Sequence, residues 1–245
     1  MNQPFNFSDL NITIVLFGTL IFFYTYYYTA NSEFLKNRFN KVNSKVYEIK
    51  LFLSKKILGF LFLGVFPGIL YFSFLDPGFS FYELFNAPFL SSLKIILILI
   101  IIIILIVFVS QKSNPERNSL QMKITDWNLQ LFGIDAFGWV IYLLAYEFLF
   151  RGILLFASYH SFGFWPAIAV NVVIYSAIHM INSKEEAIGA LIFGSIAAYF
   201  ALSQGTILIP VFMHIALSLS SDYFSIRLNK NLKFVKLKSD KTSSL

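Results

Sequence analysis

The stretch from Ile95 to Val109 carries no polar side-chain atom, and it most constrains what this chain can fold into. A helix needs about 20 apolar residues to cross a bilayer, and further windows of comparable length recur along the sequence. With 57% hydrophobic and only 13% charged residues, the chain is not a soluble domain. The sequence therefore predicts an all-α fold, a polytopic membrane helix bundle with about seven transmembrane helices. The predicted spans are 11–30, 57–75, 89–110, 136–158, 164–182, 187–203 and 206–226.

Basic residues gather in alternate connections between these windows. Connections 31–56, 111–135 and 183–186 and the tail after the last window hold 17 of the 19 Lys and Arg residues, with Lys94 and Arg151 as the exceptions. Because cytoplasmic loops carry the excess of Lys and Arg, this pattern predicts an N-terminus outside and a C-terminus in the cytoplasm. Lys36, the first positive charge, follows the first window, so that window does not look like a cleavable signal peptide. We expect an integral protein of the bacterial inner (cytoplasmic) membrane.

The net charge of +6 follows from these loops and their attraction to anionic headgroups, so we expect a lipid bilayer and no nucleic acid as partner. The absence of cysteine excludes disulfides, thiolate catalysis and cysteine-ligated zinc. In 31–56, apolar residues recur at three- to four-residue spacing among the lysines, which fits either a helix on the inner membrane surface or a solvated loop. The expected organisation is one bundle, with a three-span region at 1–130, a four-span core at 131–226 and a basic cytoplasmic tail at 227–245.

Polar and ionisable residues at membrane depth gather in the last four windows. Such groups are costly in hydrocarbon and usually face the bundle interior at a functional site. By contrast, the run 95–109 in the third window is apolar on all sides and is predicted to face lipid. The residues are Glu147, Arg151, Asn171, His179, His214, Ser218 and Asp222.

Glu147 and Arg151 are four residues apart, so they share a helix face and can form an ion pair, either structural or functional. His179 and His214 lie on two other windows. At a rise of about 1.5 Å per residue their depths would differ by roughly 10 Å, unless helix tilt or a late helix start reduces the gap. We expect the ion pair and both histidines to meet in one water-accessible cavity.

The polar residues form three motifs that resemble those of the CAAX prenyl endopeptidase and bacteriocin-processing (CPBP, or Abi) family of membrane proteases. They are Glu147-x-x-x-Arg151-Gly152, Tyr175-x-x-x-His179 and His214-x-x-x-Ser218. The family pattern is Glu-Glu-x-x-x-Arg, Phe-x-x-x-His and His-x-x-x-Asn or Asp on separate helices, and the resemblance covers about 135–225. The helix between the last two motifs spaces small residues for close packing, namely Ala190, Gly194 and Ala198.

The chain departs from the family pattern at three positions. Tyr146 stands where the family has its first glutamate, often taken as the catalytic one, and only the second, Glu147, is kept. Ser218 stands where the family has Asn or Asp. Tyr175 replaces Phe but preserves an aromatic ring.

The resemblance implies an intramembrane endopeptidase that hydrolyses a peptide or protein substrate at the membrane with a water activated by glutamate and histidine. Glu147 would be the base. His179 and His214 would either bind a divalent metal such as zinc, together with Glu147, or act directly on water and oxyanion. The supporting residues would be Arg151, which orients Glu147, and Ser218, Tyr146 and Tyr175.

A second hypothesis is a family member that has lost catalysis and serves as a membrane scaffold, partner-binding or immunity-type protein. The replacement of the first glutamate by Tyr146 supports it, whereas the retention of Glu147, Arg151 and both histidines supports the enzyme. A transporter with a buried proton relay is less consistent with the sequence, because its two halves lack matching helices broken by Gly or Pro.

Overall fold

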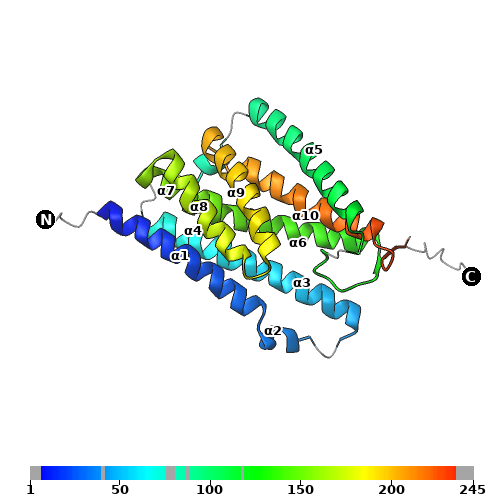
Figure 1. Ribbon diagram of the computed structural model, residues 1–245. Helices are drawn as coiled ribbons and strands as arrows, with labels where there is room; N and C mark the ends of the chain where they lie inside the picture. Colours follow the sequence, from blue (N-terminus) through cyan, green and yellow to red (C-terminus); the bar gives the residue numbers. More distant parts are fainter. Residues whose placement is uncertain (1–6, 40–41, 76–80, 87–88, 117–118, 236–245) are drawn as a thin grey trace, which may run out of the picture.

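The computed structural model describes residues 7–39, 42–75, 81–86, 89–116 and 119–235 and is almost entirely helical (Figure 1). In this part of the chain 6 helices are long and apolar enough to cross a membrane, and Phe164–His179 is a shorter apolar helix between them. These helices overlap the predicted spans, and the all-α membrane bundle is confirmed. Five of the predicted loop and tail cations lie outside the described residues, namely Lys41, Arg117, Lys236, Lys238 and Lys241.

The first two spans come from the N-terminal part of the chain. They consist of α1 (Phe7–Ala30), α2 (Glu33–Asn37), α3 (Ser44–Phe60), a π-helical turn η1 (Leu61–Val65) and α4 (Phe66–Phe74). The second span starts at Ser44, well before the predicted 57, so most of the predicted surface helix or loop at 31–56 belongs to α2 and α3.

Lys56 was predicted in the connection 31–56, but it lies in helix α3 and is only 1% exposed inside the bundle. Its Nζ lies 3.0 Å from the ring centroid of Trp139 and 4.5 Å from that of Tyr142, on α6 (Leu129–Glu147). The ammonium also interacts electrostatically with Asp135 and Asp222. Aromatic faces and carboxylates compensate the desolvation of a buried cation, which is why a lysine is tolerated here.

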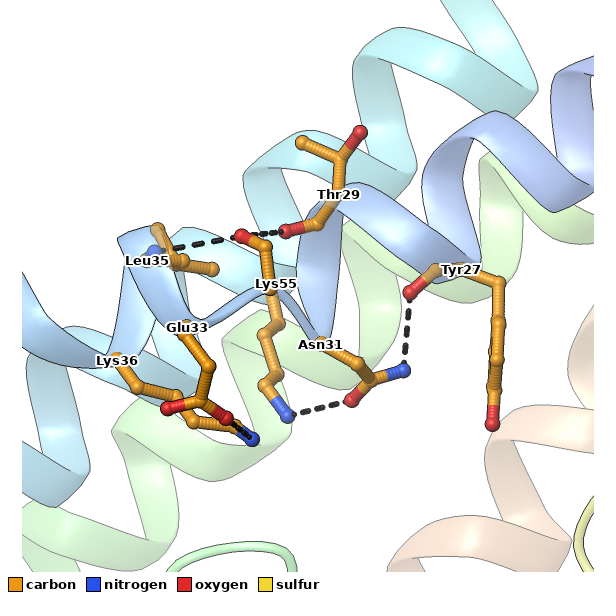
Figure 2. A network of polar contacts seen from close by, with 8 residues as sticks. Tyr27, Thr29, Asn31, Glu33, Leu35, Lys36 and Lys55 are labelled. Atoms are coloured by element: carbon orange, nitrogen blue, oxygen red, sulfur yellow. Dashed lines mark hydrogen bonds and ion pairs between the residues drawn. The ribbon is translucent and has the colours of Figure 1, made fainter.

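Figure 2 shows how the end of α1 is joined to α3. Lys55 on α3 donates from Nζ to Oδ1 of Asn31 (3.1 Å), and Asn31 donates from Nδ2 to the carbonyl oxygen of Tyr27 (3.0 Å). The hydroxyl of Ser32 accepts from the backbone N–H of Leu35 and so caps α2. This turn fixes α1 beside α3, and both helices border the cavity described below.

The remaining elements complete the bundle. They are η2 (Glu83–Phe85), α5 (Phe89–Ser113), β1 (Asp126–Trp127), α6, the π-helical η3 (Phe148–Leu155), α7 (Phe156–Phe162), α8 (Phe164–His179), α9 (Lys184–Gln204), α10 (Leu208–Leu228) and β2 (Lys233–Phe234). The continuous helix Leu129–Phe162 is the most buried span and forms the centre of the bundle. Helix α5 packs on α10 at the edge (Figure 1) and leaves Ile98, Ile101 and Val109 exposed, as the sequence predicts for a span that faces lipid.

A short parallel ladder joins the connection before α6 to the tail after α10. Asp126 pairs with Lys233 and Trp127 with Phe234. The Trp127 ring is fully buried and its Nε1 donates to the carbonyl oxygen of Ile124 (2.8 Å). The predicted loop and tail therefore contain structure that the hydropathy pattern does not indicate.

Candidate active site

Glu147 and Arg151 form the predicted ion pair at the centre of the bundle. Glu147 is the last residue of α6, and Arg151 lies in the π-helical segment η3. Arg151 Nη1 is 3.2 Å from Glu147 Oε2, and both side chains are 0% exposed. The guanidinium also stacks 3.8 Å from the ring centroid of Tyr175. Pairing and stacking offset part of the cost of holding both charges away from water.

His214 contacts the same carboxylate from the opposite side. Its Nδ1 is 2.6 Å from Glu147 Oε1, across α6 and α10. Oε1 of Glu147 also accepts a hydrogen bond from Arg151 Nη1 (3.4 Å), so Arg151 and His214 both contact this oxygen. The side chain of His214 is 12% exposed, whereas Glu147 is closed off. The imidazole thus lies between the buried carboxylate and the space beyond it.

Tyr146 brings the second histidine to the site. Its hydroxyl is 3.3 Å from Nε2 of His179, and its ring centroid is 5.7 Å from that of His214. Neighbouring residues on α6 point about 100° apart, so Tyr146 and Glu147 reach different partners. Because α10 packs on α6 and α8 packs on η3, each of the two adjacent side chains meets its own histidine.

A cavity of about 490 Å³ lies against these groups. It is bordered by Tyr146, His179, His214 and Ser218, together with polar residues such as Ser119, Gln121 and Glu186. The two histidines thus border one cavity, but Glu147 and Arg151 do not border it. We expected all four residues to line the cavity, but the ion pair lies behind His214.

The helix that carries His179 is shorter than its neighbours, which reduces the expected difference in depth between the two histidines. His179 is the last residue of α8, which has 16 residues and so spans about 24 Å, less than its neighbours. In Figure 1 the turn from α8 to α9 ends short of the C-terminal end of α10. His179 and His214 border the same cavity, so the expected difference in depth does not separate them.

Two other predicted polar residues do not border the cavity themselves. Asn171 donates from Nδ2 to the carbonyl oxygen of Phe150 (2.7 Å) and so fixes α8 on η3. Asp222 accepts from Trp139 Nε1 (2.8 Å) and from the hydroxyl of Ser119 (2.9 Å). Along α10, His214 and Ser218 therefore border the cavity, whereas Asp222 does not.

Close packing of the small-residue helix is present as predicted, with Ala190, Gly194 and Ala198 buried on α9. A Cβ at position 194 would lie 3.0 Å from the ring of Tyr175. A side chain there would push that ring toward the Arg151 guanidinium it covers, so glycine keeps the ion pair in place.

Sequence reasoning missed Glu186, which lies in the first turn of α9. Its Oε2 is 3.9 Å from His179 Nδ1 and accepts a hydrogen bond from Asn182 Nδ2 (2.8 Å). The only sequence signal was its position three residues after the helix cap Ser183, whose hydroxyl accepts from the Glu186 N–H (3.0 Å). That signal indicates a helix start and carries no information on chemistry.

The donors present do not fit a metal centre in this arrangement. Among the described residues, no three His, Asp or Glu side chains are grouped so as to hold an ion. The oxygens of Glu147 face Arg151 and His214, and Nε2 of His179 faces the hydroxyl of Tyr146. A structural or catalytic zinc needs at least three protein ligands at about 2 Å, so the chemistry below uses these side chains alone.

Residues 127–220 match the family model of type II CAAX prenyl endopeptidase Rce1-like proteins. No curated protein and no solved structure matches the chain. The matched segment runs from the end of β1 into α10 and contains all three motifs, the ion pair and both cavity histidines. The sequence resemblance is thereby confirmed: residues 127–220 of this integral membrane chain match the type II CAAX prenyl endopeptidase Rce1-like family, consistent with the CPBP family.

Proposed function

We propose that the protein is a membrane-embedded endopeptidase of the CAAX-processing type, which hydrolyses peptide bonds of a peptide or protein substrate near the membrane. The observation that carries this proposal is the 2.6 Å contact between buried Glu147 and His214, an imidazole that borders a polar cavity. A carboxylate that fixes one nitrogen of a histidine prepares the other nitrogen to take a proton. The Rce1-like domain supports the same reaction class.

In the proposed mechanism, His214 is the base and Glu147 is its orienting partner. The carboxylate accepts a hydrogen bond from Nδ1–H, so Nε2 carries the lone pair and faces the cavity water. Water gives its proton to Nε2 as its oxygen attacks the carbonyl carbon. Glu147 then stabilises the imidazolium, and Arg151 keeps Glu147 ionised and in place. The sequence had implied Glu147 as the base, and its full burial behind His214 favours the indirect role.

A cleavage assay on the purified protein in bilayers, with prenylated and unmodified peptides, tests this proposal. His214→Ala is expected to lower kcat by about 10²–10⁴-fold, the usual contribution of a general base. His160→Ala, which changes an exposed histidine on α7, is the matched control and is expected to retain the parent rate. Addition of a chelator is expected to leave cleavage unchanged.

Three results would contradict the proposal. A parent that cleaves no peptide in the panel would favour the inactive scaffold, partner-binding or immunity-type protein, which the tyrosine at position 146 supports. Equal rates for the parent and His214→Ala would remove His214 from the chemistry. Loss of activity with chelator, restored by zinc, would instead support a metal bound by Glu147, His179 and His214 in a rearranged site.

We further propose an inner-membrane orientation with the N-terminus outside and the C-terminus in the cytoplasm. The alternation of basic connections supports this orientation. Single cysteines introduced at Asn11 and at the exposed Asn231, on this cysteine-free background, provide the test. In intact cells an impermeant thiol reagent is expected to label the first position and leave the second unlabelled until the cells are opened. Labelling of position 231 in intact cells would reverse the orientation.

A further inference from the structure

The residue that departs most from the family pattern lies at the centre of the cavity wall. Tyr146 stands in place of the family's first glutamate, and its hydroxyl contacts His179 Nε2 at 3.3 Å. Its side chain is buried except where it borders the cavity. We propose that Tyr146 is a catalytic residue that donates a hydrogen bond to the oxyanion of the tetrahedral intermediate, with His179 as its positioning residue. This proposal rests on the proposed function.

The location of the hydroxyl relative to the proposed base supports this role. The rings of Tyr146 and His214 are 5.7 Å apart and nearly perpendicular, at 85°. Both residues border the same cavity, so a peptide carbonyl can direct its carbon toward water at His214 and its oxygen toward the phenol. An oxyanion donor is effective when it is already oriented at the place where negative charge develops.

The Tyr146 ring is held by its neighbours before any substrate arrives. Its centroid lies 4.6 Å from that of Phe150, 5.7 Å from that of Tyr142 and 6.0 Å from that of Tyr175. These contacts restrict the ring from several sides and so fix the direction of the hydroxyl. When His179 donates from Nε2–H to the phenolic oxygen, the phenolic proton is free to point into the cavity.

The reaction balances without any other reactant. Water forms the new C–O bond and gives one proton to His214 Nε2, while the carbonyl oxygen becomes an oxyanion bound by the Tyr146 hydroxyl. The C–N bond then breaks, the oxyanion collapses to a carbonyl, and His214 returns its proton to the leaving amine. Tyr146 contributes a hydrogen bond and keeps its own proton throughout.

Tyr146→Phe tests the proposal because it removes the hydroxyl and keeps the ring that packs on Phe150. We expect kcat for peptide cleavage to fall about 10²-fold with KM nearly unchanged, as for loss of one oxyanion donor. Affinity for a phosphonate peptide, an anionic mimic of the intermediate, is expected to fall by a similar factor, while affinity for the matched amide peptide stays constant. The control is Tyr71→Phe on α4, whose hydroxyl contacts the carbonyl oxygens of Ile14 and Val15 away from the cavity.

His179 is tested by a pair of variants. His179→Gln retains an N–H donor that can reach the phenolic oxygen, so it is expected to keep more activity and phosphonate affinity than His179→Leu. In the double variant Tyr146→Phe/His179→Leu, the loss is expected to be close to that of Tyr146→Phe alone, because His179 acts through Tyr146.

The outcomes separate this inference from the proposed function. If Tyr146→Phe cleaves and binds the phosphonate as the parent does, while His214→Ala is impaired, Tyr146 has no catalytic role and the endopeptidase proposal stands. If Tyr146→Phe loses affinity equally for the phosphonate peptide and for the amide peptide, the hydroxyl has only a general binding or structural role. The inference is then wrong. If the parent neither cleaves peptides nor binds the phosphonate more tightly than the amide, both proposals are overturned.

Discussion

Glu147→Gln is expected to lower kcat for peptide cleavage by roughly 10³–10⁴-fold, the size of effect seen when the carboxylate behind a catalytic histidine is neutralised. The amide matches the carboxylate in shape but lacks its charge. It can present its NH₂ group to His214 Nδ1, which would fix the wrong tautomer, and it cannot stabilise the imidazolium. Single-turnover rates of the bilayer-embedded variant measure it.

Glu147→Gln also leaves the fully buried Arg151 without its counter-charge, so lower stability could mimic a catalytic effect. The double variant Glu147→Gln/Arg151→Met separates the two causes. Removing both charges is expected to return the melting temperature toward that of the parent while cleavage stays at the low level of the single variant. Recovery of activity together with stability would show that the ion pair is structural and that Glu147 takes no part in the chemistry.

The helices and the candidate site residues follow from the sequence because both depend on short-range patterns. Apolar length identifies the spans, and four-residue spacing places Arg151 on the same face as Glu147. Ser218 shares the cavity with His214 for the same reason. The order of the motifs identifies the family. These patterns predict the folded structure well because a membrane helix makes its backbone hydrogen bonds within its own segment and needs no distant partner to form.

Features that depend on partners distant in sequence were not predictable. The burial of Lys56 depends on aromatic rings and carboxylates from α6 and α10, so a hydropathy window assigns it to a loop. The pairing of β1 with β2 joins segments separated by the whole core. The contact of Glu186 with His179 requires the α8–α9 turn to fold back at the cavity. In each case the composition of one segment does not indicate which distant segment it will contact.

The different partners of Tyr146 and Glu147 also needed the fold. On an isolated helix an offset of about 100° implies that only one of two adjacent residues can belong to a site. The structure has a helix on each side of α6 and η3, so Tyr146 and Glu147 both reach a histidine. The replacement of the family's first glutamate therefore changes the chemistry of the cavity wall, and the contact between Glu147 and His214 remains.

Tyr146→Glu restores the family's pair of glutamates and is expected to lower cleavage by about 10³-fold. The variant removes the phenolic donor, and it places a carboxylate where the oxyanion forms and directly before the buried Glu147, so like charges oppose both the fold and the intermediate. Cleavage rate and melting temperature are measured side by side. Tyr146→Gln is the matched control, since it has the size of glutamate and keeps an N–H donor, and it is expected to retain more activity than Tyr146→Glu.

The opposite result would have a clear physical meaning. A parent without activity that Tyr146→Glu activates would show that a carboxylate at position 146 is the missing base, and that Tyr146 blocks the position where water must be held. The contact of Tyr146 with His179 would then exclude the catalytic water from the site. The natural protein would act as a scaffold, partner-binding or immunity-type protein. Tyr146→Gln distinguishes the two cases again, because removing the phenol without adding a base would leave such a protein inactive.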